Sequence, residues 1–587
     1  MVKQLLKSIR EFKLATILTP TFVVGEVIIE ALIPFLISLL INDIKAGCDL
    51  SVILGYAWKL VVLSLLSLLC GYLAGIYCAE AGTGFARNLR YDIFTNIQKF
   101  SFSNIDKFSS ASLVTRLTTD IQNVQMAFMV IIRTAVRAPL NLIFSFTMAY
   151  IMGGTMAVIF LIIIPFLGIG LYLIVKTVMP IFKKGFPLFD KITRIVEENV
   201  KGIRVVKSFV REDYEINKFD ETSNDIRKMF TRAEQIIALN NPLMQISIYA
   251  VMLFVLMFGS EMIIKTNATS LDVGQLSTLM TYGFQIMVSL MMLSMVFVMI
   301  TFSEESCKRI VEVLNEKSSI TSKENAITEV KDGSIDFDHV RFKYSPTAER
   351  PVLEDIDIHI QSGETIGIIG GTGSAKSSLV QLIPRLYDVT EGTVRVGKED
   401  VRDYDLVTLR DSVAMVLQKN VLFSGTIADN IRWGNKDATL EEVKHVCHLA
   451  CADEFIEQLP DGYDTWIEQG GTNVSGGQKQ RLCIARALLK QPKILIMDDS
   501  TSAVDTKTDA IIRKAMKEYI PETTKIIIAQ RTSSVEDADR IIVLDGGKID
   551  VIGTSEELLK TNQIYREVYL SQNKQGTEEI VEEGGVR

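Results

Sequence analysis

The sequence predicts an all-α membrane domain of six helices, followed by a soluble α/β domain. Three observations carry this prediction. Six long apolar stretches occupy the first 302 residues. Short β-rich runs alternate with helical runs after residue 330. A glycine-rich turn links a predicted strand to a predicted helix at residues 365–378, an arrangement typical of α/β domains.

Length and composition agree with a chain of two kinds of domain. The 587 residues are too many for one ordinary domain. A hydrophobic share of 48% is high for a soluble protein, whereas 22% charged residues is too many for a chain buried wholly in lipid. The net charge of −8, without an arginine-rich patch, argues against a nucleic-acid partner. Seven scattered cysteines predict no disulfide framework.

The apolar stretches each reach or exceed the roughly 20 residues that cross a bilayer as a helix. They are residues 14–42, 53–79, 127–151, 155–178, 243–265 and 274–302. Lysines and arginines precede the first stretch and fill the connections after the second and the fourth. By the positive-inside rule both termini are therefore cytoplasmic.

The two long inner connections, residues 80–126 and 179–242, are charged and keep a helical period. We expect them to continue the membrane helices into the cytoplasm, since about 20 further residues extend a helix by roughly 30 Å. A pair of ordinary helical hairpins is the alternative. The predicted domains are a membrane domain (1–315), a linker (316–332), an α/β domain (333–572) and a flexible acidic tail (573–587).

Residues 365–378 read TIGIIGGTGSAKSS, a buried strand, a glycine-rich turn and a helix that begins at Lys376. This order is typical of a phosphate-binding loop, in which the lysine meets the β and γ phosphates and the Ser377 hydroxyl coordinates magnesium. Ala375 replaces the second glycine of the motif, and its methyl group is tolerated only if φ stays negative. The predicted phosphate-binding residues are Gly370, Gly371, Thr372, Gly373, Ser374, Ala375, Lys376, Ser377 and Ser378.

Two further apolar strands end in polar residues. The strand at 493–497 is followed by Asp498 and Asp499, and the strand at 525–529 by Gln530. The carboxyl ends of parallel strands face the ligand crevice of such a sheet. We expect Asp498 to hold magnesium through water, and Asp499 to stand where a general base would polarise the attacking water.

Residues 473–478 read NVSGGQ and precede KQRLCIARAL, and residues 502–505 read SAVD. With the loop at Lys376, these motifs have the order and spacing of ATP-binding cassette (ABC) proteins. The chain resembles an ABC exporter half-transporter of the multidrug type over nearly its whole length.

That resemblance implies ATP and Mg²⁺ as cofactors. It implies that Tyr344 stacks on adenine, that Gln418 senses the γ-phosphate and magnesium, and that Asp505 communicates across the interface with a partner. The metal-binding residues it implies are Ser377, Gln418 and Asp498. The family's signature loop acts in trans on the partner's ATP and here comprises Ser475, Gly476, Gly477 and Gln478. Residues 112–120 and 205–215 resemble the segments around the coupling helices that dock on nucleotide domains.

Two positions depart from the family pattern. Active family members carry glutamate at position 499 and histidine at position 530, whereas this chain has Asp499 and Gln530. Aspartate is one methylene shorter, and glutamine cannot relay a proton. This pair of replacements resembles the one found in the degenerate subunit of heterodimeric ABC exporters. We therefore expect a homologous partner half-transporter with an intact glutamate and histidine; a slow homodimer and a nucleotide-gated regulator or channel are the alternatives.

The transported compound stays open among drugs, lipids and peptides, carried by alternating access across a bacterial cell membrane in contact with its lipid. Glu26 and Glu30 in the first apolar stretch either attract a cationic substrate or pair with Arg133 and Arg137. A methionine stripe on the last stretch either lines a permissive cavity or packs between helices. Its members are Met287, Met291, Met295 and Met299.

Overall fold

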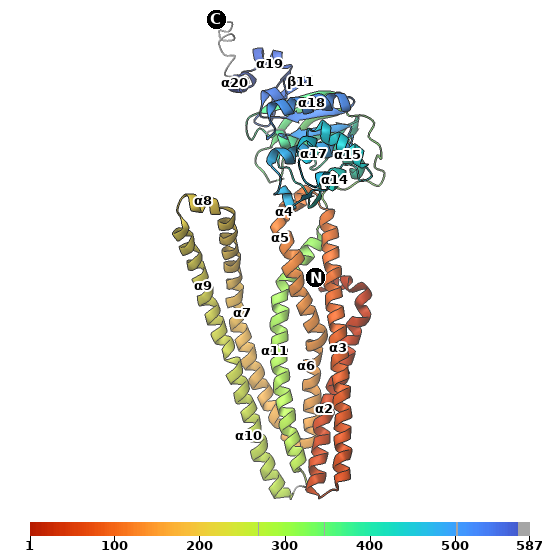
Figure 1. The fold of residues 1–587 in the computed structure, drawn as a ribbon. Coiled ribbons are helices and arrows are strands. Elements are labelled where there is room, and N and C mark those ends of the chain that lie inside the picture. Colours follow the sequence, from red (N-terminus) through yellow and green to blue (C-terminus); the bar gives the residue numbers. More distant parts are fainter. Residues whose placement is uncertain (268, 346, 501–502, 573–587) are drawn as a thin grey trace. The chain divides into compact units, whose positions relative to one another are not determined.

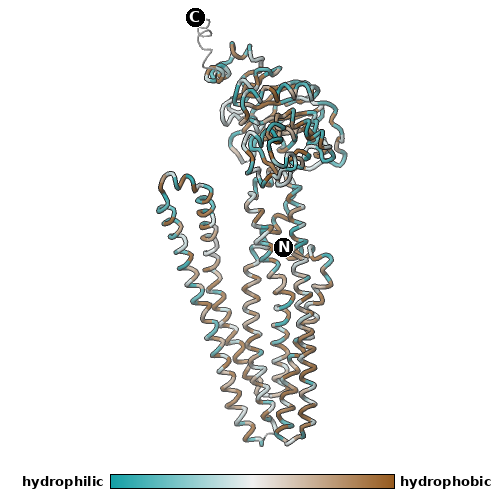
Figure 2. The backbone as a smooth tube through the Cα atoms, viewed as in Figure 1, coloured by the Kyte–Doolittle hydropathy of each residue, from teal (hydrophilic) through white to brown (hydrophobic). Residues whose placement is uncertain are grey.

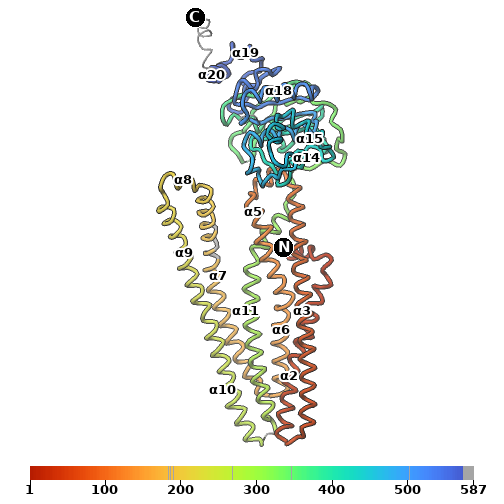
Figure 3. Tube along the Cα trace, in the orientation of Figure 1, coloured from red at the N-terminus to blue at the C-terminus, as the bar shows by residue number. Residues whose placement is uncertain are grey.

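A computed structural model describes residues 1–267, 269–345, 347–500 and 503–572 (Figures 1 and 3). The predicted acidic tail (573–587) lies outside the described residues. The chain divides into two compact units. The first comprises Met1–Lys99 and Phe108–Glu316, and the second comprises Phe100–Lys107 and the residues from Lys317 onward.

The regular elements described in the first unit are all helices, because its long apolar runs and its charged connections keep a helical period and show no strand pattern. Its long helices are α2 (Lys13–Lys45), α3 (Leu50–Gln98), α6 (Ile121–Gly153), α7 (Val158–Lys201), α9 (Glu212–Ala238), α10 (Asn240–Thr266) and α11 (Val273–Asn315). Shorter pieces are α1 (Val2–Leu5), η1 (Leu6–Phe12), α5 (Ser110–Thr115), η2 (Arg116–Asp120), η3 (Gly154–Ala157) and α8 (Ile203–Ser208). Figure 2 shows that apolar residues dominate the lower part of these helices.

Five continuous helical stretches are long and apolar enough to cross a membrane, by length and composition among the described residues. The sequence predicts six apolar crossings. The difference arises because Ser110–Lys201 counts as one stretch although it holds both α6 and α7. The chain turns back between these two helices at η3, where Gly154 has a φ of +50° (Figure 1).

The predicted helical continuation of the inner connections is confirmed. Helix α3 has 49 residues, about 73 Å at 1.5 Å per residue, which far exceeds a hydrocarbon core of about 30 Å. The second connection forms a hairpin, in which α7 runs to Lys201, α8 turns the chain, and α9 returns (Figure 1).

An ion-pair network around the buried Asp120 joins η2 to α11 within the first unit. Asp120 is fully buried and accepts hydrogen bonds from Arg309 Nε at 2.8 Å and from the Ser306 hydroxyl at 2.8 Å. Arg116 donates to the Arg309 carbonyl at 2.9 Å and pairs with Glu312 at 2.9 Å. The segment 112–120, which resembles the surroundings of a coupling helix, is therefore fixed to the last helix of its unit.

The second unit is an α/β domain with two main sheets and a short β-ribbon. The six-stranded sheet has the order β12-β11-β3-β10-β9-β6 and is parallel except for β12. Its strands are β3 (Thr365–Gly370), β6 (Val413–Val416), β9 (Ile494–Asp498), β10 (Thr524–Ile528), β11 (Arg540–Asp545) and β12 (Lys548–Gly553). The antiparallel sheet β2-β1-β4-β5 holds β1 (Ile335–Phe342), β2 (Leu353–Ile360), β4 (Glu391–Val396) and β5 (Glu399–Asp400); the ribbon pairs β7 (Gly425–Thr426) with β8 (Trp466–Ile467).

All of α4 (Phe102–Phe108) except its last residue belongs to the second unit. The other helices described in this unit are α12 (Lys376–Gln381), α13 (Leu406–Ser412), α14 (Ile427–Arg432), α15 (Leu440–Leu449), α16 (Asp453–Ile456), α17 (Gly476–Leu489), α18 (Thr506–Tyr519), α19 (Ser555–Thr561) and α20 (Gln563–Gln572), with turns η4 (Gly462–Asp464), η5 (Gln469–Gly471) and η6 (Thr532–Ser534). Strand β10 pairs in parallel with both β3 and β9. The carboxyl ends of these three central strands therefore meet at one edge of the sheet.

Residues Phe100–Lys107 belong to the second unit, although the predicted membrane domain (1–315) includes them. Asn104 donates to the Lys317 carbonyl at 3.2 Å, and the hydroxyls of Ser101 and Ser319 lie 2.7 Å apart. The Tyr387 hydroxyl donates to Asp106 at 2.9 Å. These partners are more than 200 residues away along the chain, so a local sequence pattern cannot predict that residues Phe100–Lys107 group with the second unit.

Candidate nucleotide-binding site

The phosphate loop follows β3 and leads into α12, as the sequence predicts. The Lys376 ammonium curls back over the loop and donates to the carbonyls of Gly370 at 2.8 Å and Gly371 at 2.9 Å. Burial lowers the pKa of Lys376, while the negative charges of Asp498 and Asp499 oppose this shift. The lysine thus lies against the loop backbone and within electrostatic reach of the two acidic side chains, where it would meet a phosphate.

Ala375 lies in the left-handed region, with φ of +70° and ψ of +20°. The negative φ that would tolerate its methyl group is therefore not present. A left-handed conformation costs an L-residue with a Cβ roughly 1–2 kcal/mol. The loop stores this strain at the position where the motif has glycine.

Ala375→Gly is therefore expected to raise the thermal unfolding midpoint of the second unit. The free energy of unfolding should rise by at most about 1 kcal/mol, because glycine also increases the conformational entropy of the unfolded chain. Ala510→Gly is the matched control, because Ala510 is exposed and lies away from the ends of α18; this change should lower the free energy of unfolding by about 1 kcal/mol. Calorimetry of both variants checks the prediction, and a loss of stability in both would contradict it.

The predicted magnesium-binding residues Ser377 and Asp498 are brought together. Asp498 is the last residue of β9 and is 5% exposed. Burial raises the pKa of Asp498, and a hydrogen bond from Ser377 lowers it. A carboxylate beside a hydroxyl, near a phosphate loop, fits Mg²⁺, which prefers oxygen ligands.

Asp499 and Gln530 also meet, since β9 and β10 are neighbours. Gln530 Nε2 donates to Asp499 Oδ2 at 2.7 Å, and Gln418 Nε2 donates to the same oxygen at 3.2 Å. Asp499 has a φ of +49° and is 8% exposed. Both amides are donors that cannot take up a proton, so this cluster lacks the proton relay of a histidine.

Tyr344 follows β1 and leaves about half of its surface exposed. Its hydroxyl lies 2.8 Å from the Ser378 hydroxyl on α12. Its ring packs edge-on against Tyr387, with centroids 5.1 Å apart and planes at 89°. Sequence reasoning missed Tyr387 and its partner Asp106, because neither belongs to a motif.

The signature loop caps the 14-residue helix α17. Ser475 Oγ accepts from the Gln478 amide at 3.3 Å, and the Gln478 side chain accepts from the Ser475 amide at 2.9 Å, a capping box. A Cβ at Gly477 would lie 2.9 Å from the Ala503 carbonyl oxygen. Ser475 and Gly476 are exposed, so the positive end of this helix dipole faces outward and suits an anion.

Asp505 caps the next helix, α18, and accepts from the Thr508 amide at 3.0 Å. Hydrogen bonds from the backbone and side chain of Thr508 lower the pKa of Asp505. The carboxylate is exposed, so it is available to a partner. Ser502, at the start of the same motif, lies outside the described residues.

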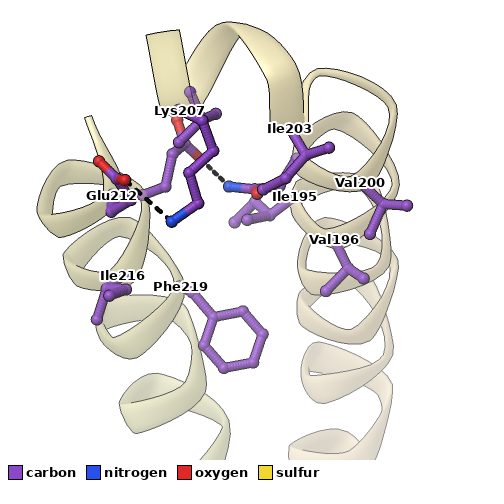
Figure 4. Close-up of a pocket in the computed structure, with 11 residues that line it drawn as sticks. Ile195, Val196, Val200, Ile203, Lys207, Glu212, Ile216 and Phe219 are labelled. Atoms are coloured by element: carbon purple, nitrogen blue, oxygen red, sulfur yellow. Dashed lines mark hydrogen bonds and ion pairs between the residues drawn. The ribbon is translucent and has the colours of Figure 1, made fainter. Parts of the chain in front are cut away.

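The hairpin α7–α8–α9 carries the other segment that resembles a coupling-helix region, residues 205–215. Figure 4 shows an apolar hollow of about 340 Å³ near its tip, lined by Ile195, Val196, Val200, Ile203, Ile216 and Phe219 among others. Lys207 pairs with Glu212 at 3.0 Å across the turn. In the turn between α8 and α9, Phe209 is 72% exposed and Val210 is 81% exposed.

Three charged residues of the membrane helices α2 and α6 form ion pairs with each other. Arg137 on α6 contacts Glu26 at 3.1 Å and Glu30 at 2.7 Å on α2, which confirms the pairing interpretation for Arg137. The methionine stripe divides between the two interpretations. Met287 is fully buried in the core, whereas Met291 and Met295 line a hollow of about 260 Å³.

Long apolar helices joined to a phosphate-loop domain with an exposed signature loop define an ATP-binding membrane transporter. A model of the ABC transporter transmembrane region matches residues 16–302, and an ABC transporter model matches residues 353–502. The chain belongs to the ABC transporter family, as an exporter half-transporter with one membrane domain and one ATPase domain that couples hydrolysis to transport.

Curated relatives cover most of the chain. The uncharacterized ABC transporter ATP-binding protein YfiB of Bacillus subtilis is 34% identical over 94% of this chain and 96% of its own length. The ATP-dependent lipid A-core flippase of Desulfotalea psychrophila is 32% identical over 85% of this chain and 86% of its own. A bacterial Atm1-family ABC exporter with ATP bound shares the fold, with a TM-score of 0.82 at 24% identity, covering 96% of this chain and 98% of its own.

Proposed function

We propose that this chain is the degenerate-site subunit of a heterodimeric ABC exporter. The complex would move hydrophobic or amphipathic compounds out of a bacterial cell through its plasma membrane, with both termini in the cytoplasm. The observation that carries the proposal is the Asp499–Gln530 pair at the carboxyl ends of β9 and β10.

The chemistry of this pair favours ATP binding over hydrolysis. A general base must reach the attacking water and accept its proton. Aspartate is one methylene shorter than the family's glutamate, and Asp499 Oδ2 already accepts from Gln530 and Gln418. ATP and Mg²⁺ would be held by the phosphate loop, Ser377, Gln418 and Asp498, with adenine on Tyr344, but the water would be poorly activated.

The signature loop of this chain would complete the partner's site. Ser475 and Gly476 are exposed at the N-terminus of α17, and Gly477 leaves no room for a side chain against Ala503. This arrangement would let backbone N–H groups approach a phosphate held by another chain. Asp505, exposed at the start of α18, would report the state of one site to the other.

Two apolar surfaces support assembly with a second half-transporter. The hairpin tip exposes Phe209 and Val210. In the second unit, Phe423 and Trp433 stack at 4.1 Å with 45% and 63% of their surfaces exposed, beside a hollow of about 350 Å³. We propose that each chain's hairpin tip occupies this hollow of its partner, which links ATP-driven closure to the membrane helices in alternating access.

The methionine-lined hollow supports a hydrophobic substrate. It lies between α7, the junction of α9 and α10, and α11, near the cytoplasmic ends of the predicted spans. Methionine is polarizable and adaptable, which suits varied apolar ligands. The flippase among the relatives is named for a lipid, in line with a substrate taken from the membrane.

Reconstitution in lipid vesicles tests the proposal. Vesicles that hold the chain co-purified with its partner should accumulate a hydrophobic dye in an ATP-dependent way. The chain alone should hydrolyse ATP at least roughly 10²-fold more slowly than the pair, as expected when acid–base catalysis is lost. Vigorous Mg²⁺-dependent hydrolysis by the lone chain would indicate a homodimer instead. Downhill flux without accumulation would indicate a nucleotide-gated channel.

A further inference from the structure

Tyr387 lies between the α4 segment and the predicted adenine platform. Its hydroxyl donates to Asp106 Oδ2 at 2.9 Å. Its ring contacts Phe102, with centroids 6.0 Å apart, and packs edge-on against Tyr344 at 5.1 Å. All of these residues belong to the second unit. One side chain thus contacts both α4 and Tyr344.

The contacts continue from Tyr344 into the phosphate loop. The Tyr344 hydroxyl lies 2.8 Å from the hydroxyl of Ser378, which is 8% exposed on α12. Lys376 and Ser377 open the same helix. A continuous series of contacts therefore runs from Asp106 through Tyr387 and Tyr344 to the helix that carries the phosphate-binding residues.

The hydrogen bond from the Tyr387 hydroxyl to Asp106 connects this series of contacts to α4. Burial and the neighbouring Asp106 carboxylate raise the pKa of this hydroxyl, so it is a neutral donor to a charged acceptor, the stronger kind of hydrogen bond. Asn104 of α4 also donates to the Lys317 carbonyl of the linker, and the hydroxyl of Ser101, just before α4, lies 2.7 Å from that of Ser319. The Tyr387 hydroxyl is directed at α4 rather than at a backbone group of its own segment.

We propose that Tyr387 is a positioning residue that couples the nucleotide base on Tyr344 to the α4 segment. The inference rests on the proposed function, in which adenine stacks on Tyr344. A stacked base restricts the Tyr344 ring, and the edge-on contact transmits this restriction to Tyr387, because aromatic pairs favour definite geometries. An ordered Tyr387 then holds Asp106 and α4 more firmly. Since coupling is reciprocal, a firmly docked α4 also strengthens ATP binding.

Hydrogen exchange of residues 100–108 measures the coupling in the full-length chain assembled with its partner. ATP without Mg²⁺, at a concentration that saturates each variant, should slow this exchange about fivefold in the wild type, the lower end of ordinary couplings. Tyr387→Phe keeps the ring but removes the hydroxyl, and it should abolish the slowing. Tyr404→Phe is the matched control, since its buried hydroxyl donates to the Val396 carbonyl at 2.8 Å instead, and it should preserve the slowing.

Inorganic tripolyphosphate separates the base from the phosphates. It can occupy the phosphate loop but offers no base to Tyr344, so it should leave the exchange of α4 unchanged. Equal slowing by tripolyphosphate and ATP would overturn the inference, as would slowing by ATP that persists in Tyr387→Phe. If the wild-type chain binds no ATP, the proposed function fails together with this inference. ATP binding with an unresponsive α4 overturns the inference alone.

A double-mutant cycle distinguishes coupling from a general loss of packing. Asp106→Ala should reproduce the effect of Tyr387→Phe on the exchange of α4. The two changes combined should have no larger effect than either alone, because they remove the same hydrogen bond. Additive effects would show that the two side chains act independently and would contradict the proposal.

Discussion

Gly477→Asp in this chain is expected to lower ATP hydrolysis by the assembled pair roughly 10²-fold or more, the scale of losing a phosphate-stabilising donor group. The new side chain would collide with the Ala503 carbonyl, 2.9 Å from a Cβ at this position, and would place a negative charge at the N-terminus of α17. That charge would repel the partner's bound ATP. Asp499→Asn in the same chain should change the rate less than about twofold, because its own site contributes little acid–base catalysis.

Steady-state hydrolysis by the co-purified pair checks this contrast. Gly462→Asp is the matched control, since Gly462 has a φ of +50°, which aspartate tolerates better than most residues, and a Cβ there would meet no atom within 4 Å. It should leave the rate near that of the wild type. Equal losses in Gly477→Asp and Asp499→Asn would mean that this chain's own site hydrolyses ATP, against the proposal.

Asp120→Ala is expected to destabilise the first unit by about 2–4 kcal/mol. Removing one partner of a buried ion pair costs about 3–5 kcal/mol, and the figure is lowered here because Arg309 reaches solvent with 43% of its side chain exposed. Loss of this carboxylate also leaves the Ser306 hydroxyl without its acceptor. The tie between η2 and α11 would be lost, so the segment from α5 to the start of α6 should move more freely.

Unfolding of the purified chain in a detergent titration, followed by circular dichroism, measures this loss. Glu197→Ala, which removes an exposed i,i+4 pair with Lys201, is the control and should cost less than about 0.5 kcal/mol. Asp120→Ala combined with Arg309→Leu should recover most of the stability, because no unpaired charge remains. Failure of the second change to restore stability would show that Asp120 matters for packing rather than for its charge.

The assignment of the two kinds of domain follows from local sequence alone. Long apolar stretches must form helices in a membrane, because every backbone polar group there needs an internal partner. The order of a strand, a glycine-rich turn, Lys376 and a helix is likewise a local pattern that predicts a phosphate loop. Asp499 and Gln530 are identified as departures from the family by position alone.

Only the tertiary structure decided which of these groups meet. The strand order β3-β10-β9 brings Asp498 to Ser377 and Asp499 to Gln530. The packing of α6 against α2 places Arg137 at ion-pair distance from Glu26 and Glu30. The tertiary structure also determines the left-handed backbone conformation of Ala375 and the grouping of Phe100–Lys107 with the second unit. Local sequence specifies propensity and chemistry, whereas contacts between residues far apart in the sequence are set by strand order and helix packing.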